Sequence, residues 1–377
     1  MIIKKIQLKN YRNYEDLDVQ LSDKLNIFIG DNAQGKSNLL ESIVVLALTK
    51  SYMNVKDRNL INDNSDFTNI KASVLFGDNT SELFVSFDEN NKKLKINNKE
   101  IKKYSDYISK VRFILFSPYE VGFVKGSPSF RRKYFNIEIS QLSNRYVKLL
   151  QSYNATLKKR NQFLKSDYKN DDASKFYLDV INDKFSTLAV EITKEREKFI
   201  NKINNNLASI FEEISGYLGL KLNYVCNVEL DSDKDVMKNN FLSKLNKNFE
   251  REKFYGMTLF GPHRDDYFLS LDEKDLSIYG SQGQNRLSVL ALKLSEISIF
   301  KDVTGDYPIL LLDDVFSELD ITKRNRLVKY ILEDVQTIIT TTDLEMIDES
   351  LVKRSKIFKI VDGHIVDSTE KEGMKDE

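Results

Sequence analysis

Eight consecutive residues, Gly30 to Ser37, place two glycines, a lysine and a hydroxyl at a spacing suited to anion binding. Their order, Gly-Asp-Asn-Ala-Gln-Gly-Lys-Ser, matches the pattern G-x-x-x-x-G-K-[ST] at every position. The glycines let the backbone curl, so that successive N–H groups point at a phosphate. Lys36 would then contact the β- and γ-phosphates, and the Ser37 hydroxyl would ligate Mg²⁺. The pattern therefore predicts ATP and Mg²⁺ as cofactors.

The residues on either side of this loop have the composition that a phosphate-binding loop requires. Residues 25–29 are mostly apolar and predict a buried strand, whereas residues 38–48 contain no Gly or Pro and predict a helix. The N-terminus of that helix adds partial positive charge at the loop. The predicted nucleotide contacts are Gly30, Asp31, Asn32, Ala33, Gln34, Gly35, Lys36, Ser37 and Asn38, together with Arg12 and Asn13 from an earlier polar turn.

A pair of acids, Asp313 and Asp314, follows a run of four apolar residues far downstream. An apolar strand that ends in acids is weak evidence alone, but a phosphate loop about 275 residues upstream supplies the other half of a magnesium site. Asp313 would hold Mg²⁺ opposite Ser37, and Asp314 would act as the general base for the attacking water. The long gap predicts a large insertion between the two motifs.

A second anion-binding pattern, Ser281-Gln282-Gly283-Gln284, precedes a predicted helix over residues 287–300. A serine and a glycine at a helix start suit phosphate binding, yet one ATP does not need two such sites on one chain. We therefore expect Ser281, Gly283 and Gln284 to contact the nucleotide of a second copy, which makes dimerisation ATP-dependent. Together with Lys36 and Asp314, Ser281 completes the predicted catalytic set.

Composition narrows the class of protein. The single cysteine, Cys226, excludes an intramolecular disulfide, and no segment reaches about 18 apolar residues, so we expect a soluble cytoplasmic protein without a membrane partner. The formal net charge is +0, but residues 92–165 contain eighteen Lys or Arg and four Asp or Glu, a net charge of +14. Either this segment binds a polyanion or its surface is simply rich in lysine; composition leaves both open.

The pattern along the chain predicts an α/β fold with an insertion. Alternating runs at 1–29 and 70–120 predict strands, including an antiparallel sheet appended to the nucleotide core. Apolar residues between 142 and 214 recur at helical spacing, which indicates long helices packed antiparallel around a polar loop at 166–173. The predicted domains are a discontinuous ATPase head, 1–128 and 256–377, and an inserted all-α helical arm, 129–255.

These motifs, in this order, resemble the ABC-type ATPase heads of the SMC-like class, and most closely the RecF family of bacterial recombination mediators. The resemblance covers nearly the whole chain. Its residues include Val124–Pro128, Gly261–Asp266, Gly280–Arg286 and Leu311–Asp320. It implies an ATP-driven dimer that binds duplex, gapped or junction DNA, hydrolyses ATP slowly, and helps RecO and RecR proteins to load RecA in replication-fork repair and the SOS response.

Several assignments follow from the resemblance or remain open. It implies that Asp320 closes a D-loop, while the residues 116–120, with Glu120, are the candidate for a Q-loop that has no evident glutamine. His263 could sense the nucleotide or belong to a structural network. Competing functions are a transporter-coupled head and a nuclease-coupled head. Whether the protein is more than a weak ATPase is left undecided by the sequence.

The expected DNA contacts lie in the basic segment. The candidates are Lys125, Arg131, Arg132, Lys158, Lys159 and Arg160. Binding through phosphates should depend on salt and show weak sequence preference. The alternative is that Arg131 and Arg132 only brace the arm through ion pairs with acidic residues.

Overall fold

The computed structural model describes residues 1–377 except 54, 170, 319–322, 325, 327–334 and 371–377. Within the described chain, the contacts between residues define two units. Unit 1 comprises Met1–Val121, Ser209–Leu218 and Gln282–Glu377, and unit 2 comprises Gly122–Ala208 and Gly219–Ser281.

A mainly parallel sheet of six strands carries both acids and the strand before the loop. Its order is β15-β14-β3-β13-β12-β8, and all neighbours are parallel except the terminal hairpin β14–β15. The strands are β3 (Leu25–Ile29), β8 (Phe113–Phe116), β12 (Ile309–Asp313), β13 (Thr337–Thr341), β14 (Ser355–Val361) and β15 (His364–Glu370). The central strands are buried on both faces, which explains their near-continuous apolar sequences.

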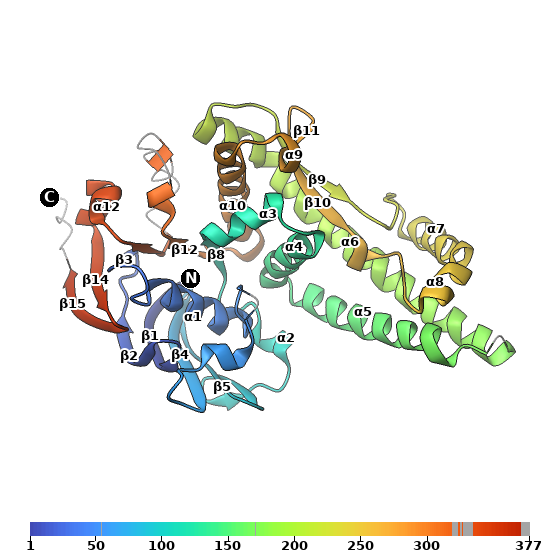
Figure 1. Cartoon of the computed structure of the whole chain (residues 1–377), viewed down its shortest axis with the longest axis horizontal. Coiled ribbons are helices and arrows are strands. Elements are labelled where there is room, and N and C mark those ends of the chain that lie inside the picture. Colours follow the sequence, from blue (N-terminus) through green and yellow to red (C-terminus); the bar gives the residue numbers. More distant parts are fainter. Residues whose placement is uncertain (54, 170, 319–322, 325, 327–334, 371–377) are drawn as a thin grey trace. The chain divides into compact units, whose positions relative to one another are not determined.

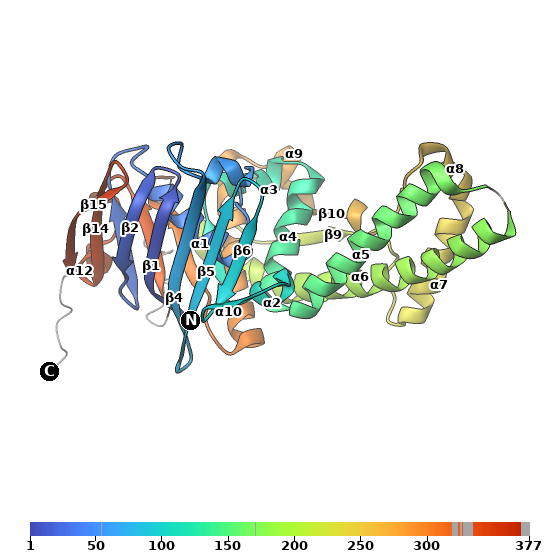
Figure 2. The ribbon, with the colours of Figure 1, turned by 90° about the horizontal axis from the view of Figure 1, so that it is seen from below.

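A second six-stranded sheet in unit 1 is antiparallel, in the order β2-β1-β4-β5-β6-β7 (Figure 2). Its strands alternate buried and exposed residues because one face packs on the core. They are β1 (Ile2–Tyr11), β2 (Tyr14–Gln20), β4 (Phe67–Phe76), β5 (Asn79–Asp88), β6 (Lys92–Ile96) and β7 (Lys99–Glu100).

Helix α1 (Lys36–Leu48) contacts strands of both sheets and is buried on almost every side (Figure 1). Its apolar residues join one core with those of β1, β4, β5 and β13, so the start of this helix is held firmly in place. Helix α10 (Gln282–Thr304) contacts β8. The shorter segments of unit 1 are α2 (Tyr104–Tyr107), α12 (Glu349–Lys353) and single turns at Asp57–Leu60, Pro118–Val121, Val315–Glu318 and Leu344–Met346.

Unit 2 is mostly helical and carries a small sheet. Two of its long helices, α5 and α6, run side by side, with α7 and α8 alongside them (Figures 1 and 2). The helices are α3 (Gly122–Lys125), α4 (Pro128–Leu142), α5 (Asn144–Gln162), α6 (Asp172–Ser215, of which Ser209–Ser215 fall in unit 1), α7 (Lys234–Lys247), α8 (Phe249–Tyr255) and α9 (Leu276–Tyr279). The sheet order is β11-β10-β9, formed by β9 (Leu220–Val225), β10 (Asp266–Leu271) and β11 (Lys274–Asp275).

The expected α/β fold is confirmed, and three local predictions need correction. Strand β8 lies beside β12 in the parallel sheet and not in the appended one. The helical spacing predicted from residue 142 is interrupted at Ser143, which leaves the helical conformation and whose side chain caps α5. The arm segment is not all helical, since β9 pairs with β10.

The two units also have different bounds from the predicted domains. Residues 256–281, expected in the ATPase head, group with the helical unit because β10 pairs with β9. The division into domains at 128 and 256 remains a prediction. Among the described helices, none combines the length and apolar character that crossing a bilayer requires.

Candidate functional site

The phosphate loop connects β3 to α1, which begins at Lys36. Gly35 has φ +110°, a conformation that side-chain-bearing residues rarely adopt. The Lys36 ammonium is buried and donates hydrogen bonds to the carbonyl oxygens of Gly30 and Asp31, both at 2.7 Å. Burial lowers the Lys36 pKa, and the carboxylates of Asp314 and Asp313 oppose this effect. The ammonium therefore stays beside the loop, turned inward as phosphate binding requires.

The turn between β1 and β2 supports the loop from one side. The Asn13 amide donates to the Gln34 carbonyl at 3.0 Å and accepts from the Asn38 amide at 2.8 Å. The Tyr14 hydroxyl donates to the Gly35 carbonyl at 2.9 Å. Asn13, predicted to contact nucleotide, thus holds the shape of the loop through both of its side-chain polar atoms.

The turn between β14 and β15 closes on the loop from another side. The Gly363 N–H donates to the Gln34 carbonyl at 3.1 Å. A Cβ at Gly30 would come 2.4 Å from the Ile360 carbonyl oxygen, so only glycine fits there. Since Gln34 is bonded from both turns, the loop geometry depends on contacts that the loop's own sequence does not specify.

The two residues predicted to hold Mg²⁺, Ser37 and Asp313, lie next to each other. The Ser37 hydroxyl donates to Asp313 Oδ1 at 2.8 Å, across 276 positions of sequence. Thr340, directly opposite Asp313 in the parallel register, donates to the same oxygen at 2.7 Å. Burial raises the Asp313 pKa, and the two hydroxyl donors oppose that rise. Thr340 is a site residue that the sequence reading missed, because the pairing of β12 with β13 is not visible in a sequence.

Asp314 adopts φ 52°, which turns the chain immediately after β12. Its N–H donates to the Thr340 carbonyl at 3.2 Å, so the strained residue is fixed by β13. Its Oδ1 is buried and has no hydrogen-bond partner among the described residues. A buried acceptor of this kind fits a bound group that donates to it.

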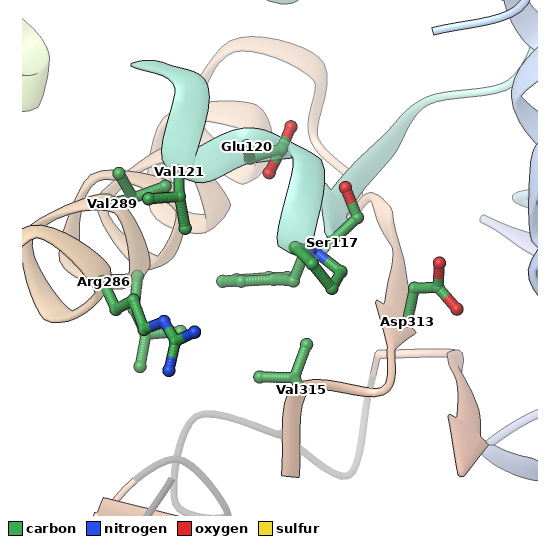
Figure 3. Close-up of a pocket in the computed structure, with 10 residues that line it drawn as sticks. Ser117, Glu120, Val121, Arg286, Val289, Asp313 and Val315 are labelled. Atoms are coloured by element: carbon green, nitrogen blue, oxygen red, sulfur yellow. The ribbon is translucent and has the colours of Figure 1, made fainter. Parts of the chain in front are cut away.

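A small pocket lies beside Asp313, where β8, α10 and the end of β12 meet (Figure 3). Ser117 and Glu120, from the segment expected to be a Q-loop, line one side, and Arg286 of α10 lines another. The Ser117 hydroxyl is buried without a hydrogen-bond partner in the described chain. Glu120 is paired with buried Lys293 of α10 at 3.0 Å, so this segment is tied to the helix that the serine-glycine motif opens.

The residues fit ATP with Mg²⁺. The loop offers curled backbone N–H groups, Lys36 offers a cation, and Ser37 and Asp313 offer the oxygen ligands that Mg²⁺ prefers. The acceptor at Asp314 and the hydroxyl of Ser117 leave polar groups for nucleotide-bound water. The described residues contain no cluster of three or more His, Cys, Asp or Glu suited to a metal, so the ion would need phosphate and water ligands.

The residues of the second predicted anion motif are exposed or half-buried. Ser281 and Gly283 are exposed, and a Cβ added at Gly283 would meet nothing within 4 Å. Gln284 is half-buried, and the long helix α10 begins at Gln282. The start of a 23-residue helix is thus accessible to an anion from another molecule. Asp320, assigned to a D-loop, lies outside the described residues.

Arg12 differs most from its expected role. Its guanidinium forms two hydrogen bonds with buried Glu41 of α1, at 2.9 and 3.0 Å. The Tyr11 and Ser51 hydroxyls bond to the same carboxylate. A direct nucleotide contact by Arg12 remains a prediction, and the structure shows a brace between β1 and α1. No sequence signal had pointed to Glu41, because a buried acid within an apolar helix is recognised only from its partners.

The six DNA candidates lie in unit 2 and differ in how far their side chains are buried. Arg160 is fully buried, ion-paired with Glu252 at 2.6 Å and bonded to Asn182 and Thr258, so its assignment as a DNA contact is wrong. Neighbouring Lys158 and Lys159 are exposed on α5. The sequence could not separate these three because they are consecutive basic residues, whereas the helix turns one of them inward.

Arg131 and Arg132 form the bracing contacts of the alternative reading. Arg131 makes two hydrogen bonds with Asp266, at 2.7 and 2.8 Å, and Arg132 donates to the Asp265 carbonyl at 2.8 Å. Both acids lie at the start of β10, in the same unit. The sixth candidate, Lys125, is exposed and donates to the Ser277 carbonyl at 2.6 Å.

His263 belongs to a structural network. Its ring nitrogens lie 2.7 Å from the Tyr153 hydroxyl and 3.1 Å from the Thr258 carbonyl. Burial lowers its pKa to about 4, which keeps the ring neutral at neutral pH. A neutral ring that donates to Thr258 and accepts from Tyr153 satisfies both contacts. Of the two readings left open, the structural one is favoured.

Comparison with known proteins decides the family. The RecF/RecN/SMC N terminal domain matches residues 2–365. The chain is 37% identical over 370 residues to a DNA replication and repair protein RecF of Staphylococcus epidermidis, covering 97% of this chain and all of that protein. The chain belongs to the RecF family. A RecF of Listeria welshimeri is likewise 37% identical over 367 residues, covering 97% of this chain and 99% of the relative.

Solved structures agree with this assignment. A structure of the recombination mediator protein RecF with ATP, described as part of the RecFOR pathway, has a TM-score of 0.90 at 30% identity, covering 98% of this chain and 97% of that one. A head domain of Smc from Pyrococcus furiosus has a TM-score of 0.55 at 15% identity, covering 98% of this chain and 96% of the other. The second match concerns the fold alone, and it supports the ABC-type head expected from the motifs.

Proposed function

We propose that this RecF-family chain is an ATP-controlled DNA-binding switch of recombinational repair and replication-fork maintenance. The observation that carries the proposal is the 2.8 Å hydrogen bond from Ser37 to Asp313, with Lys36 beside them. It joins the phosphate loop and the acidic strand into one site, as a magnesium nucleotide requires. Relatives solved with ATP and named as DNA replication and repair proteins support the same function.

Within this site, Lys36 and the loop N–H groups hold the phosphates, and Ser37 and Asp313 hold Mg²⁺. Mg²⁺ bound there would neutralise negative charge on the phosphates. Asp314 orients the attacking water and accepts its proton through the carboxylate oxygen that has no partner in the described chain. Because the Asp314 backbone N–H is bonded to the Thr340 carbonyl, the residue that carries this oxygen is held in place before nucleotide arrives.

The exposed motif at the start of α10 binds the nucleotide held by a second copy, so ATP joins two chains. Hydrolysis would then remove the shared phosphate and let the two chains dissociate. A slow rate of hydrolysis therefore sets how long the dimer lasts. We further propose that the dimer binds duplex, gapped or junction DNA and works with RecO- and RecR-type proteins to load RecA. The family assignment favours this function over transporter-coupled and nuclease-coupled heads.

The nucleotide site is tested by calorimetric titration with ATP and Mg²⁺. Lys36→Ala removes the cation next to the phosphates, and we expect at least about tenfold weaker binding, the size of one charge-assisted contact. Lys50→Ala, an exposed lysine just after the same helix, is the matched control and should bind as the wild type does. Equal affinities in both variants would remove Lys36 from the site and overturn the proposal.

A further inference from the structure

A second pocket lies at the hairpin between β4 and β5 in unit 1, and no residue of the phosphate loop lines it. Its cavity volume is about 200 Å³, below the roughly 300–1,000 Å³ of drug-sized ligand sites, so it suits only a small molecule. The lining combines apolar side chains with amides, hydroxyls and two cations. The lining residues are Met1, Val74, Phe76, Asn79, Ser81, Leu83, Ser109, Lys110 and Arg112.

The guanidinium of Arg112 is the feature of this pocket that indicates a ligand. Its Nε and Nη1 atoms are buried, and neither has a hydrogen-bond acceptor among the described residues. Its carbon lies 5.2 Å from the centre of the Phe76 ring, which covers one face of the group. A buried donor left without an acceptor costs about 1–3 kcal/mol, so native proteins rarely keep one without a reason.

Other arginines of this chain show what a paired guanidinium looks like. Arg160, Arg196 and Arg131 each lie within 2.7 Å of a carboxylate oxygen. The charge of Asp306 acts on Arg112 through its electrostatic field, but this carboxylate is ion-paired with the Met1 amine at 2.7 Å. Burial lowers the Arg112 pKa in spite of that field, as expected for a cation without a close counter-ion.

We infer that this pocket binds a small organic anion, with a carboxylate or phosphate group at Arg112 and an apolar body on the floor. Arginine suits both groups because its N–H donors match their oxygens. Exposed Lys110 adds a second positive charge, and Asn79, Ser81 and Ser109 add polar groups at the rim. Buried Val74 and Leu83, with the Phe76 ring, form the apolar part.

The inference is tested by following the Arg112 Nε–H signal of the full-length protein by ¹⁵N NMR, assigned from its loss in Arg112→Lys. Three probes separate the sources of the anion: benzoate, phenyl phosphate and inorganic phosphate. We expect benzoate or phenyl phosphate to shift this signal with saturation at or below about 10 mM, and inorganic phosphate to act more weakly because it lacks the apolar body. No saturable shift with any probe would overturn the inference.

A second measurement guards against binding elsewhere, since the phosphate loop also binds anions. The benzoate-dependent rise in melting temperature is compared in wild type, Arg112→Met and Arg58→Met, the last being an arginine of the same unit outside the pocket. We expect Arg112→Met to raise the half-saturating benzoate concentration by about tenfold or more, and Arg58→Met to leave it unchanged. An equal rise in all three proteins would place the binding elsewhere and refute the site.

Discussion

At the scale of single residues, the proposed function assigns the chemistry to Asp314 and much of the affinity for ATP to Lys36. The two roles separate because the Asp314 acceptor is buried and faces no protein donor in the described chain, whereas Lys36 is bonded within the loop. Asp314→Asn keeps the volume and removes the base. We expect ATP binding within about twofold of wild type and a turnover lowered by about 10²-fold or more.

Steady-state phosphate release and nucleotide titration measure these two quantities on the same sample. Asp302→Asn, an exposed aspartate on α10, is the control and should leave both unchanged. Undiminished turnover in Asp314→Asn would mean that another group activates the water.

His263 predicts a pH dependence of stability. Its pKa is about 4 in the fold and its ordinary value is 6.5, so between these values the unfolded chain binds more protons than the folded one. Stability therefore falls as the pH drops from about 6.5 to about 4, by up to about 3 kcal/mol from this group. Urea unfolding of wild type and His263→Gln across this window should show a shallower fall in the variant.

His364, the other histidine, is exposed and supplies the matched control. His364→Gln should follow the wild-type curve at every pH. If His263→Gln also follows it, the buried ring does not control acid stability.

At the scale of elements, the buried pair Lys293–Glu120 ties α10 to the turn after β8. Removing one partner leaves the other charge buried, at a cost of about 3–5 kcal/mol. We expect Lys293→Met to lose about that much stability in urea, and Lys293→Met with Glu120→Gln to recover part of it. A double variant as unstable as the single one would show that the unpaired Glu120 carboxylate does not cause the loss of stability.

The contacts of Arg131 and Arg132 with β10 predict a structural outcome for the double alanine variant. The free energy of unfolding should drop by about 1–3 kcal/mol for each lost charged hydrogen bond, which lowers the melting temperature. The salt dependence of DNA binding should stay unchanged. Lys148→Ala on exposed α5 should melt as the wild type does. A flattened salt slope with normal melting would return these arginines to the DNA site.

The elements also show how far a sequence can lead. The loop, both acids and the serine-glycine motif follow from local spacing, because each motif is contiguous and its chemistry is set by residue type. Thr340, Glu41 and the inward turn of Arg160 do not, since each depends on which strand or helix lies next to it. Strand β8 was misplaced for the same reason: four apolar residues look alike in a parallel and in an antiparallel sheet.

At the scale of the whole molecule, the exposed lysines of α5 remain the best DNA candidates. Each neutralised phosphate releases counterions, so Lys158→Ala with Lys159→Ala should flatten the salt dependence of duplex affinity by up to about 2 units, equally for unrelated sequences. Lys9→Ala with Lys24→Ala, two exposed lysines of unit 1, is the matched control. A slope identical to wild type would exclude Lys158 and Lys159 from the DNA surface.

The central claim is that ATP joins two chains through the motif that opens α10. Sedimentation of wild type and Ser281→Arg, with a non-hydrolysable ATP analogue and with gapped duplex DNA present or absent, tests it most directly. The arginine places bulk at an exposed position, so the monomer should still fold and bind nucleotide. We predict a nucleotide-dependent dimer for wild type and a monomer for Ser281→Arg under the same conditions. A normal dimer in the variant, or no dimer in wild type with nucleotide and DNA, would contradict the account.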